Sequence, residues 1–197
     1  MKLNGFKNIT FEKKHVANCA IIKNDKPVPC KIYKLEEGDE DYYCKKLKTS
    51  TWKNCLFSFG DSPRPKGYFI HRDHFVIEDE KERCISFCEV EPNATPFEAH
   101  LHAIETAPKY SSANGKRKAK YIGETLIAFL AMHYQKMNKN LYVENALGEA
   151  EDFYSKNCHM TKVREIIFSD YTLPKEAIEQ LLLQNEAHTK TKIEYLA

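Results

Sequence analysis

A run of basic residues ahead of a long apolar segment is the clearest place for chemistry in this sequence. Between Thr106 and Glu124 there is no acidic residue, and five of the 30 Lys and Arg residues fall there: Lys109, Lys116, Arg117, Lys118 and Lys120. The apolar segment is a predicted helix, and a helix N-terminus presents unpaired N–H groups and about half a positive charge. These features favour a phosphate site, where Gly123 leaves room for close approach to the backbone. The alternative is an ordinary solvated basic loop.

The histidines and cysteines are weaker candidates for a functional site than the basic segment. His100 and His102 share a face of a predicted strand and could be bases or ligands, although such a pair is more often ordinary packing. His71 and His74 lack the further partners that a metal site needs. The seven cysteines are odd in number and form no Cys-x-x-Cys pair, which favours reduced structural thiols inside a cell.

Composition narrows the class of protein. The chain has 197 residues, 42% of them hydrophobic and 29% charged, which fits one soluble domain. No apolar run approaches the roughly 20 residues of a membrane span, and the N-terminus has no apolar core typical of a secretory signal. We therefore expect a cytoplasmic protein without membrane contact. The net charge of +2 argues neither for nor against a polyanionic partner.

The elements that must position these residues change character midway along the chain. The first half is predicted to be mostly strands, with a hairpin formed by 74–77 and 84–90 around a charged turn. The other expected strands are 16–22, 31–35 and 99–104, and Pro27-Val28-Pro29 is expected to end the first of them. A stretch of mixed polar and apolar residues is expected at 39–47.

The second half alternates helices and strands. Ile122, Leu126, Phe129, Leu130 and His133 share one face of a predicted helix over 122–134. Further expected elements are a strand at 141–143, a short helix at 149–157, a strand at 163–168, a helix begun by Pro174 and running through 183, and a strand at 192–196. This order predicts a mixed α/β or α+β domain around one largely antiparallel sheet.

This frame resembles the GCN5-related N-acetyltransferase (GNAT) superfamily. Ala150 to Asn157, with the sequence AEDFYSKN, is similar to that family's Ala-x-x-Phe-Tyr-x-Lys helix, and Thr106-Ala107-Pro108 stands where Val-x-Pro is common. Lys118 to Gly123 takes the place of the family's Gln/Arg-x-x-Gly-x-Gly/Ala motif, with Lys118 for Gln/Arg and Tyr121 for the first glycine. The terminal Gly-Phe of the helix motif is replaced by Cys158-His159.

The resemblance covers about 31–168 and implies a sheet splayed between the family's strands four and five. It divides the chain into an N-terminal extension packed on the domain (1–30), a GNAT-like acyl-CoA-binding domain (31–170), and a C-terminal helix and strand completing that domain (171–197). It implies acetyl-CoA as co-substrate, an amine of a small molecule or a protein as acceptor, and no metal. A homodimer is compatible with it.

Roles follow from the same resemblance. Tyr154 would protonate the leaving thiolate, Glu105 would be the general base, and the backbone N–H of Thr106 would face the thioester carbonyl. Asn145 would contact pantetheine or the next helix. The expected diphosphate and 3′-phosphate contacts are Lys116, Arg117, Lys118, Ala119, Lys120, Tyr121, Ile122, Gly123, Glu124 and Thr125, with the Glu124 side chain turned away.

Two other functions stay open. Tyr121 at a usual glycine and the missing Gly-Phe also fit a non-catalytic GNAT-fold module that binds acyl-CoA or a protein. The basic segment 109–120 could bind nucleic acid, but a net charge of +2, one Trp and no recognised motif make this the weakest hypothesis.

Overall fold

The structure, a computed structural model, describes residues 13–35, 72–81, 83–107, 110, 119–165 and 168–196. These residues contain ten strands, which form one sheet in the order β10-β1-β2-β3-β4-β5-β7-β9-β8, with β6 paired to β1. All pairings are antiparallel except that of β5 with β7. The strands are β1 (Lys14–Lys23), β2 (Lys26–Lys34), β3 (Asp73–Asp79), β4 (Cys84–Glu91), β5 (Glu98–Thr106), β6 (Ala119–Lys120), β7 (Asn140–Ala146), β8 (Thr161–Glu165), β9 (Ser169–Leu173) and β10 (Glu194–Tyr195).

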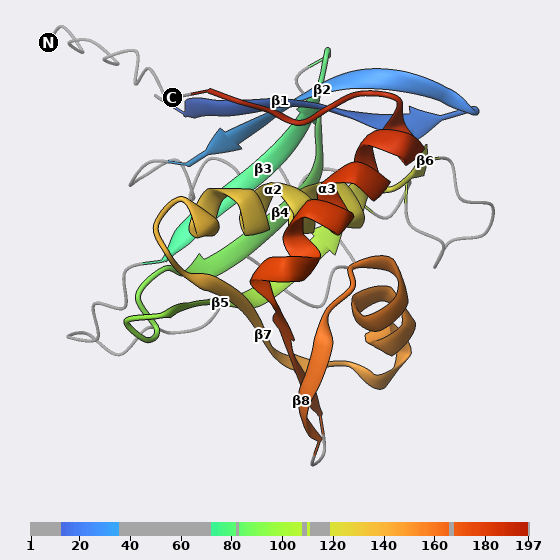
Figure 1. The fold of residues 1–197 in the computed structure, drawn as a ribbon. Coiled ribbons are helices and arrows are strands. Elements are labelled where there is room, and N and C mark those ends of the chain that lie inside the picture. The colour runs from blue at the N-terminus through green and yellow to red at the C-terminus, as the bar shows by residue number, and fades with distance from the viewer. Residues whose placement is uncertain are drawn as a thin grey trace, which may run out of the picture.

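Two long helices, α2 (Ile122–Gln135) and α3 (Lys175–Thr189), lie on the same face of this sheet (Figure 1). The apolar positions of α2 pack on the strands, with the Phe129 ring 5.3 Å from that of Phe75 on β3. Each such buried side chain stabilises the fold by about 1.5–3 kcal/mol. Because α3 packs on its outer side, α2 is buried on more than the single face predicted from its spacing.

The β1–β2 hairpin corrects one prediction. Pro27-Val28-Pro29 does not end the strand; the chain turns at Asn24 and Asp25, and β2 runs through both prolines. Among the described residues β3 pairs with Cys30–Lys34, so both prolines lie in the part of β2 that precedes this pairing, where β3 needs no N–H from them.

The predicted 74–90 hairpin is confirmed as β3 and β4, and the predicted helix at 122–134 is α2. Two strands were missed, the two-residue β6 and the longer β9. The predicted strand at 163–168 is β8 at Thr161–Glu165, and the chain then returns as β9, which inserts between β7 and β8. Alternation is weak there because β8 is an edge strand with mostly exposed residues.

Both ends of the described chain build the sheet. Residues 13–30, within the predicted N-terminal extension, form β1 and the start of β2, and 171–196 supply most of β9 together with α3 and β10. β10 pairs with β1, so the two ends meet at one edge. The predicted amphipathic stretch at 39–47 lies outside the described residues.

Candidate active site

A gap opens in the sheet between β5 and β7. The two strands pair only from Glu98 with Asn140 to Leu101 with Val143. Just beyond this pairing each strand gains an extra residue: His102 in β5 relative to β4, and one residue at 144–145 in β7 relative to β9, where Asn145 has a φ of 54°. Such bulges bend a strand and increase its twist, and here they account for the divergence of the two strands.

Backbone groups of β5 point into this gap. The Ala107 N–H donates to the Ile85 carbonyl of β4 at 2.9 Å, and the Glu105 carbonyl accepts from Ser86 Oγ at 2.5 Å. Since successive peptide groups of a strand point to opposite edges, the N–H groups of Thr106 and Ile104 face away from β4. The prediction for Thr106 therefore fits the geometry, and Ile104 joins it as a second group that the sequence did not single out.

The register also separates the two faces of the gap. Phe75, which contacts α2, pairs with Cys88, and Cys88 pairs with Ile104, so Ile104 points to the helix side. Thr106 shares that side, whereas Glu105 points to the opposite face with its partner Phe87. Glu105 and the helices thus lie on opposite sides of the gap.

Tyr154 lies on the helix side. It belongs to a π-helical turn, η3 (Phe153–Asn157), that follows a 3₁₀ turn, η2 (Gly148–Ala150). Its ring packs 5.3 Å from that of Tyr171, which pairs with Val143 at the start of the gap. The side chain is buried, and burial together with the nearby Cys158 and Tyr171 raises the pKa of Tyr154 well above its usual value. The phenol therefore stays protonated and can act as a donor.

The N-terminus of α2 opens beside this turn. Tyr121 caps the helix without a side-chain bond, has a φ of 65°, and stacks on His188 of α3 at 4.3 Å, so its ring is held against α3. Gly123 serves a different contact from the one expected. A Cβ there would lie 3.0 Å from Phe153 Cζ, so the glycine lets the Phe153 ring approach the first turn of α2.

The Glu124 side chain points to α3. It is 4% exposed, and its carboxylate accepts from Gln184 at 3.2 Å and from Asn185 at 3.1 Å, and contacts His188 Nδ1 at 3.1 Å. Thr125 is fully buried and also bonded by Asn185. Glu124 therefore offers its backbone N–H rather than its side chain to a ligand, whereas the Thr125 N–H donates to the Tyr121 carbonyl at 2.8 Å.

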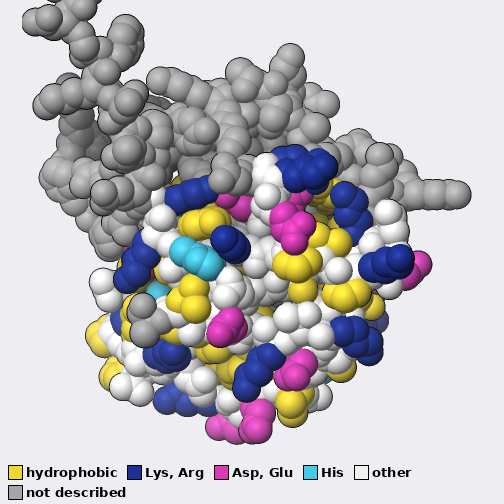
Figure 2. Space-filling model, turned by 90° about the horizontal axis from the view of Figure 1, so that it is seen from above, with side chains coloured by type: hydrophobic (Ala, Val, Ile, Leu, Met, Phe, Trp, Pro, Cys, Tyr) yellow, Lys and Arg dark blue, Asp and Glu magenta, His cyan; other side chains and the backbone are white. Residues whose placement is uncertain are grey.

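The basic segment is described only in part. Ala119 and Lys120 form β6 against the end of β1, and Lys120 Nζ lies 3.0 Å from Asp25 of the hairpin turn. Lys116, Arg117 and Lys118 lie outside the described residues. Figure 2 shows basic and acidic side chains interspersed on the face that it presents, without a continuous basic patch there.

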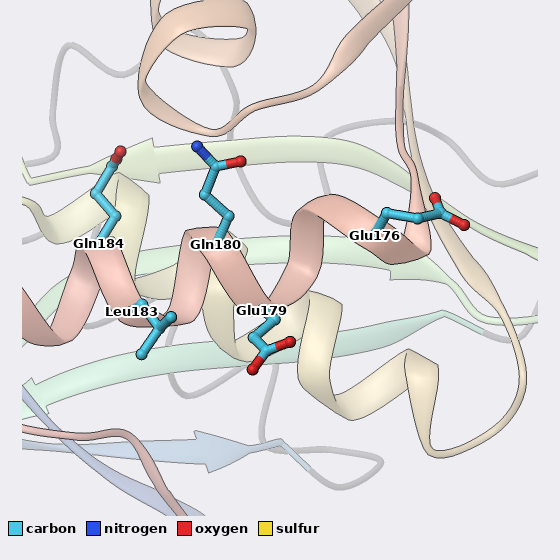
Figure 3. A pocket seen from close by; sticks show the side chains of 5 residues that line it. All are labelled: Glu176, Glu179, Gln180, Leu183 and Gln184. Carbon is cyan, nitrogen blue, oxygen red and sulfur yellow. The ribbon is translucent and has the colours of Figure 1, made fainter.

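Other features of the described residues do not compete with the gap. A hollow on α3 is walled by one helix only, with side chains that fan outward (Figure 3): Glu176, Glu179, Gln180, Leu183 and Gln184. Among the described ranges no group of three or more His, Cys, Asp or Glu could hold a metal ion, and no helix is long and apolar enough to span a bilayer.

Known proteins were compared with this chain at the level of sequence and of structure. No family model and no curated sequence matches it. Solved structures do match. A spermidine N-acetyltransferase of Vibrio cholerae in complex with CoA and spermine has a TM-score of 0.51 at 16% identity, over 76% of this chain and 98% of that one. A GNAT-family acetyltransferase of Staphylococcus aureus Mu50 has a TM-score of 0.51 at 11% identity, over 74% and 99%.

The chain has the GNAT fold. A chimera of the Vibrio cholerae spermidine N-acetyltransferase and hSSAT agrees, with a TM-score of 0.52 at 18% identity over 76% of this chain and 98% of that one. In the GNAT fold β5 and β7 take the places of strands four and five, and α2 takes the place of the long helix between them.

The departures from the GNAT motifs now have structural readings. Tyr121 adopts the left-handed conformation that favours glycine, which is the residue usual at that place. At the end of the Phe-Tyr helix, Cys158 has an ordinary φ of −108° and the left-handed residue is His159, one position later. The π turn explains this shift, because it adds a residue to the helix.

The hydrogen bond of Asn145 connects β7 to β9 and does not reach across the gap. Its backbone N–H donates to Asp170 at 2.9 Å, and Asp170 also accepts from the Tyr142 hydroxyl at 3.0 Å. Asp170 thus fastens the bulge of β7 to β9. No local pattern pointed to Asp170 or to the α3 residues around Glu124, because these contacts join segments distant along the chain.

Proposed function

We propose that this chain is an acyl-CoA-dependent N-acetyltransferase that moves the acetyl group of acetyl-CoA to an amine of a small molecule or a protein. The observation that carries the proposal is the gap between β5 and β7, with backbone N–H groups on its edge and the buried Tyr154 beside it. The likeness to acetyltransferase structures, one of them with CoA bound, supports it.

In this proposal the cofactor enters from the helix side. Its diphosphate binds the amides at the first turn of α2, from Tyr121 to Glu124, with Ala119, Lys120 and the cations Lys116, Arg117 and Lys118 around it. Pantetheine runs along the open edge of β5 like an added strand, close to Asn145, and the N–H of Thr106 or Ile104 polarises the thioester carbonyl.

The reaction then needs two proton movements. The amine nitrogen attacks the carbonyl carbon from the face opposite α2, where Glu105 takes a proton from it. As the C–S bond breaks, the thiolate takes a proton from the Tyr154 phenol. Binding and placement of the reactants supply the rest of the rate enhancement.

A Tyr154→Phe variant tests this assignment. Loss of the phenolic proton should lower kcat by about 100-fold while the acetyl-CoA affinity measured by calorimetry stays within about twofold. Release of free thiol is followed with a panel of amines, and Tyr33→Phe, on β2, is the matched control. Absence of acetyl-CoA binding at millimolar concentration would refute the proposal.

The second candidate is a non-catalytic module that binds acyl-CoA or a protein. The Phe153 ring against Gly123 and the Tyr121 side chain at a position where glycine is usual favour it, because both fill space at the N-terminus of α2 that a glycine-rich loop leaves open. Acetyl-CoA binding without thiol release from any amine, and without an effect of Tyr154→Phe, would select this function.

A further inference from the structure

A cluster of histidines and glutamates closes the apex of the gap on the face opposite α2. His100 and His102 come from β5, Glu91 from β4, Glu98 from β5 and Glu144 from β7. His102 and Glu144 are the first residues of their strands beyond the last β5–β7 pair. The cluster therefore sits at the point where the two strands separate.

Its members are joined in a chain of contacts across the gap. Glu144 lies 2.7 Å from His100 Nδ1 and 3.3 Å from His102 Nδ1, and Glu91 lies 3.1 Å from His102 Nε2. His100 Nε2 also lies 3.3 Å from Glu98. Each carboxylate thus fixes the orientation of a ring, and Glu144 links the two histidines.

The cluster carries an excess of negative charge. Within the described ranges, the ion pairs of its three carboxylates are all to His100 and His102. Three carboxylates against two imidazoles leave a net negative charge even with both rings protonated. Among the described residues, the Tyr142 ring also lies against the cluster: it stacks on His100 at 4.7 Å, and its hydroxyl donates to Asp170.

The cluster is open to a ligand. The His102 side chain is 22% exposed, Glu91 24% and Glu144 32%. His102 lies two residues before Ile104, whose N–H faces the gap, so the two are about 7 Å apart along the strand.

We propose that this cluster is the acceptor site of the N-acetyltransferase proposed above, that Glu91 and Glu144 hold a cationic aliphatic amine, and that His102 takes its first proton. An ammonium cannot attack a carbonyl, so it must first give one proton to a basic group, here the His102 ring. The nitrogen lone pair then forms the C–N bond, the C–S bond breaks, and the thiolate is protonated by Tyr154. The second nitrogen proton goes to Glu105. The reaction thus uses two proton acceptors on this face, His102 and Glu105.

Kinetics separate the two roles. With saturating acetyl-CoA and 1,4-diaminobutane as acceptor, His102→Gln should lower kcat by about 100-fold and be partly rescued by added imidazole. Glu91→Gln should raise the amine KM by about tenfold with a smaller change in kcat. The controls are His15→Gln and Glu80→Gln. If His102→Gln and Glu91→Gln change only the melting temperature and leave kcat and KM within twofold, the proposal is wrong.

A binding measurement keeps this inference separable from the acetyltransferase proposal. In the full chain, imidazole NMR signals of His100 and His102 should shift on titration with 1,4-diaminobutane, while His15 and a titration with n-butanol show no change. If no amine is acetylated but these shifts occur, the cation site stands and the role of His102 in proton transfer falls. If neither occurs, the inference is overturned.

Discussion

Gly123 shows how one missing side chain shapes the candidate site. In most helices an alanine is more stable than a glycine by about 1 kcal/mol. Here the Cβ would meet the Phe153 ring at 3.0 Å, in the first turn of α2. The sequence suggested that the glycine serves a phosphate, and the structure adds an aromatic contact that the residue pattern alone could not reveal.

Gly123→Ala should therefore destabilise the protein by about 1 kcal/mol, because overpacking outweighs the gain in helix propensity. In a Phe153→Ala background the same change should stabilise it by a similar amount. Urea unfolding of the four variants measures this as a double-mutant cycle. Equal effects in both backgrounds would rule out the Phe153 contact as the reason for the glycine.

At the scale of elements, α3 is fastened to the N-terminus of α2. Gln184, Asn185 and His188 surround the buried Glu124 carboxylate, and His188 also stacks on Tyr121. Two helices far apart in the sequence thus share the mouth at which the diphosphate is proposed to bind. α3 consequently positions the candidate site from outside the segment that resembles GNAT proteins.

Glu124→Ala should destabilise the fold by about 2–4 kcal/mol, since it leaves the donors of α3 buried without their acceptor. Glu176→Ala, in the exposed first turn of α3, should change the free energy of unfolding by less than about 0.5 kcal/mol. Chemical denaturation compares the two variants. A Glu124→Ala protein as stable as Glu176→Ala would show that the carboxylate does not hold the helices together.

The helices and strands with strong local patterns were predictable, but the bulges and contacts between these elements were not. Alternation gave the 74–90 hairpin, and helical spacing gave α2. The bulges at His102 and 144–145 follow from hydrogen-bond register between strands, which no local pattern encodes. For the same reason Tyr154 and Thr106 came from a motif, whereas the importance of Ile104 and Asp170 emerged only from pairing.

At the scale of the whole molecule, the edge where the chain ends meet contains an acid-sensitive group. His133 of α2 is 5% exposed among Phe75 and Phe129, with Nδ1 3.0 Å from the Tyr195 hydroxyl of β10. Burial lowers the pKa of His133 to about 4, against the opposing effect of Asp73. The folded state therefore favours the neutral ring.

This predicts a loss of stability in acid. The contribution of the neutral His133 ring to the free energy of unfolding is complete above the pKa of the unfolded state, about 6.5. It is lost as the pH falls from there through the folded pKa of about 4. The loss amounts to at most about 3 kcal/mol. Melting temperatures between pH 7 and pH 4 should fall less steeply for His133→Phe than for the wild type, with His15→Gln as control. Parallel curves for His133→Phe and the wild type would contradict the assignment.

The most direct test of the central claim is a crystal structure of the full chain with CoA. The account predicts the diphosphate against the backbone amides at the first turn of α2, pantetheine along the open edge of β5, and the sulfur beside the Tyr154 hydroxyl. CoA bound elsewhere, or strands β5 and β7 closed over an excluded cofactor, would contradict it.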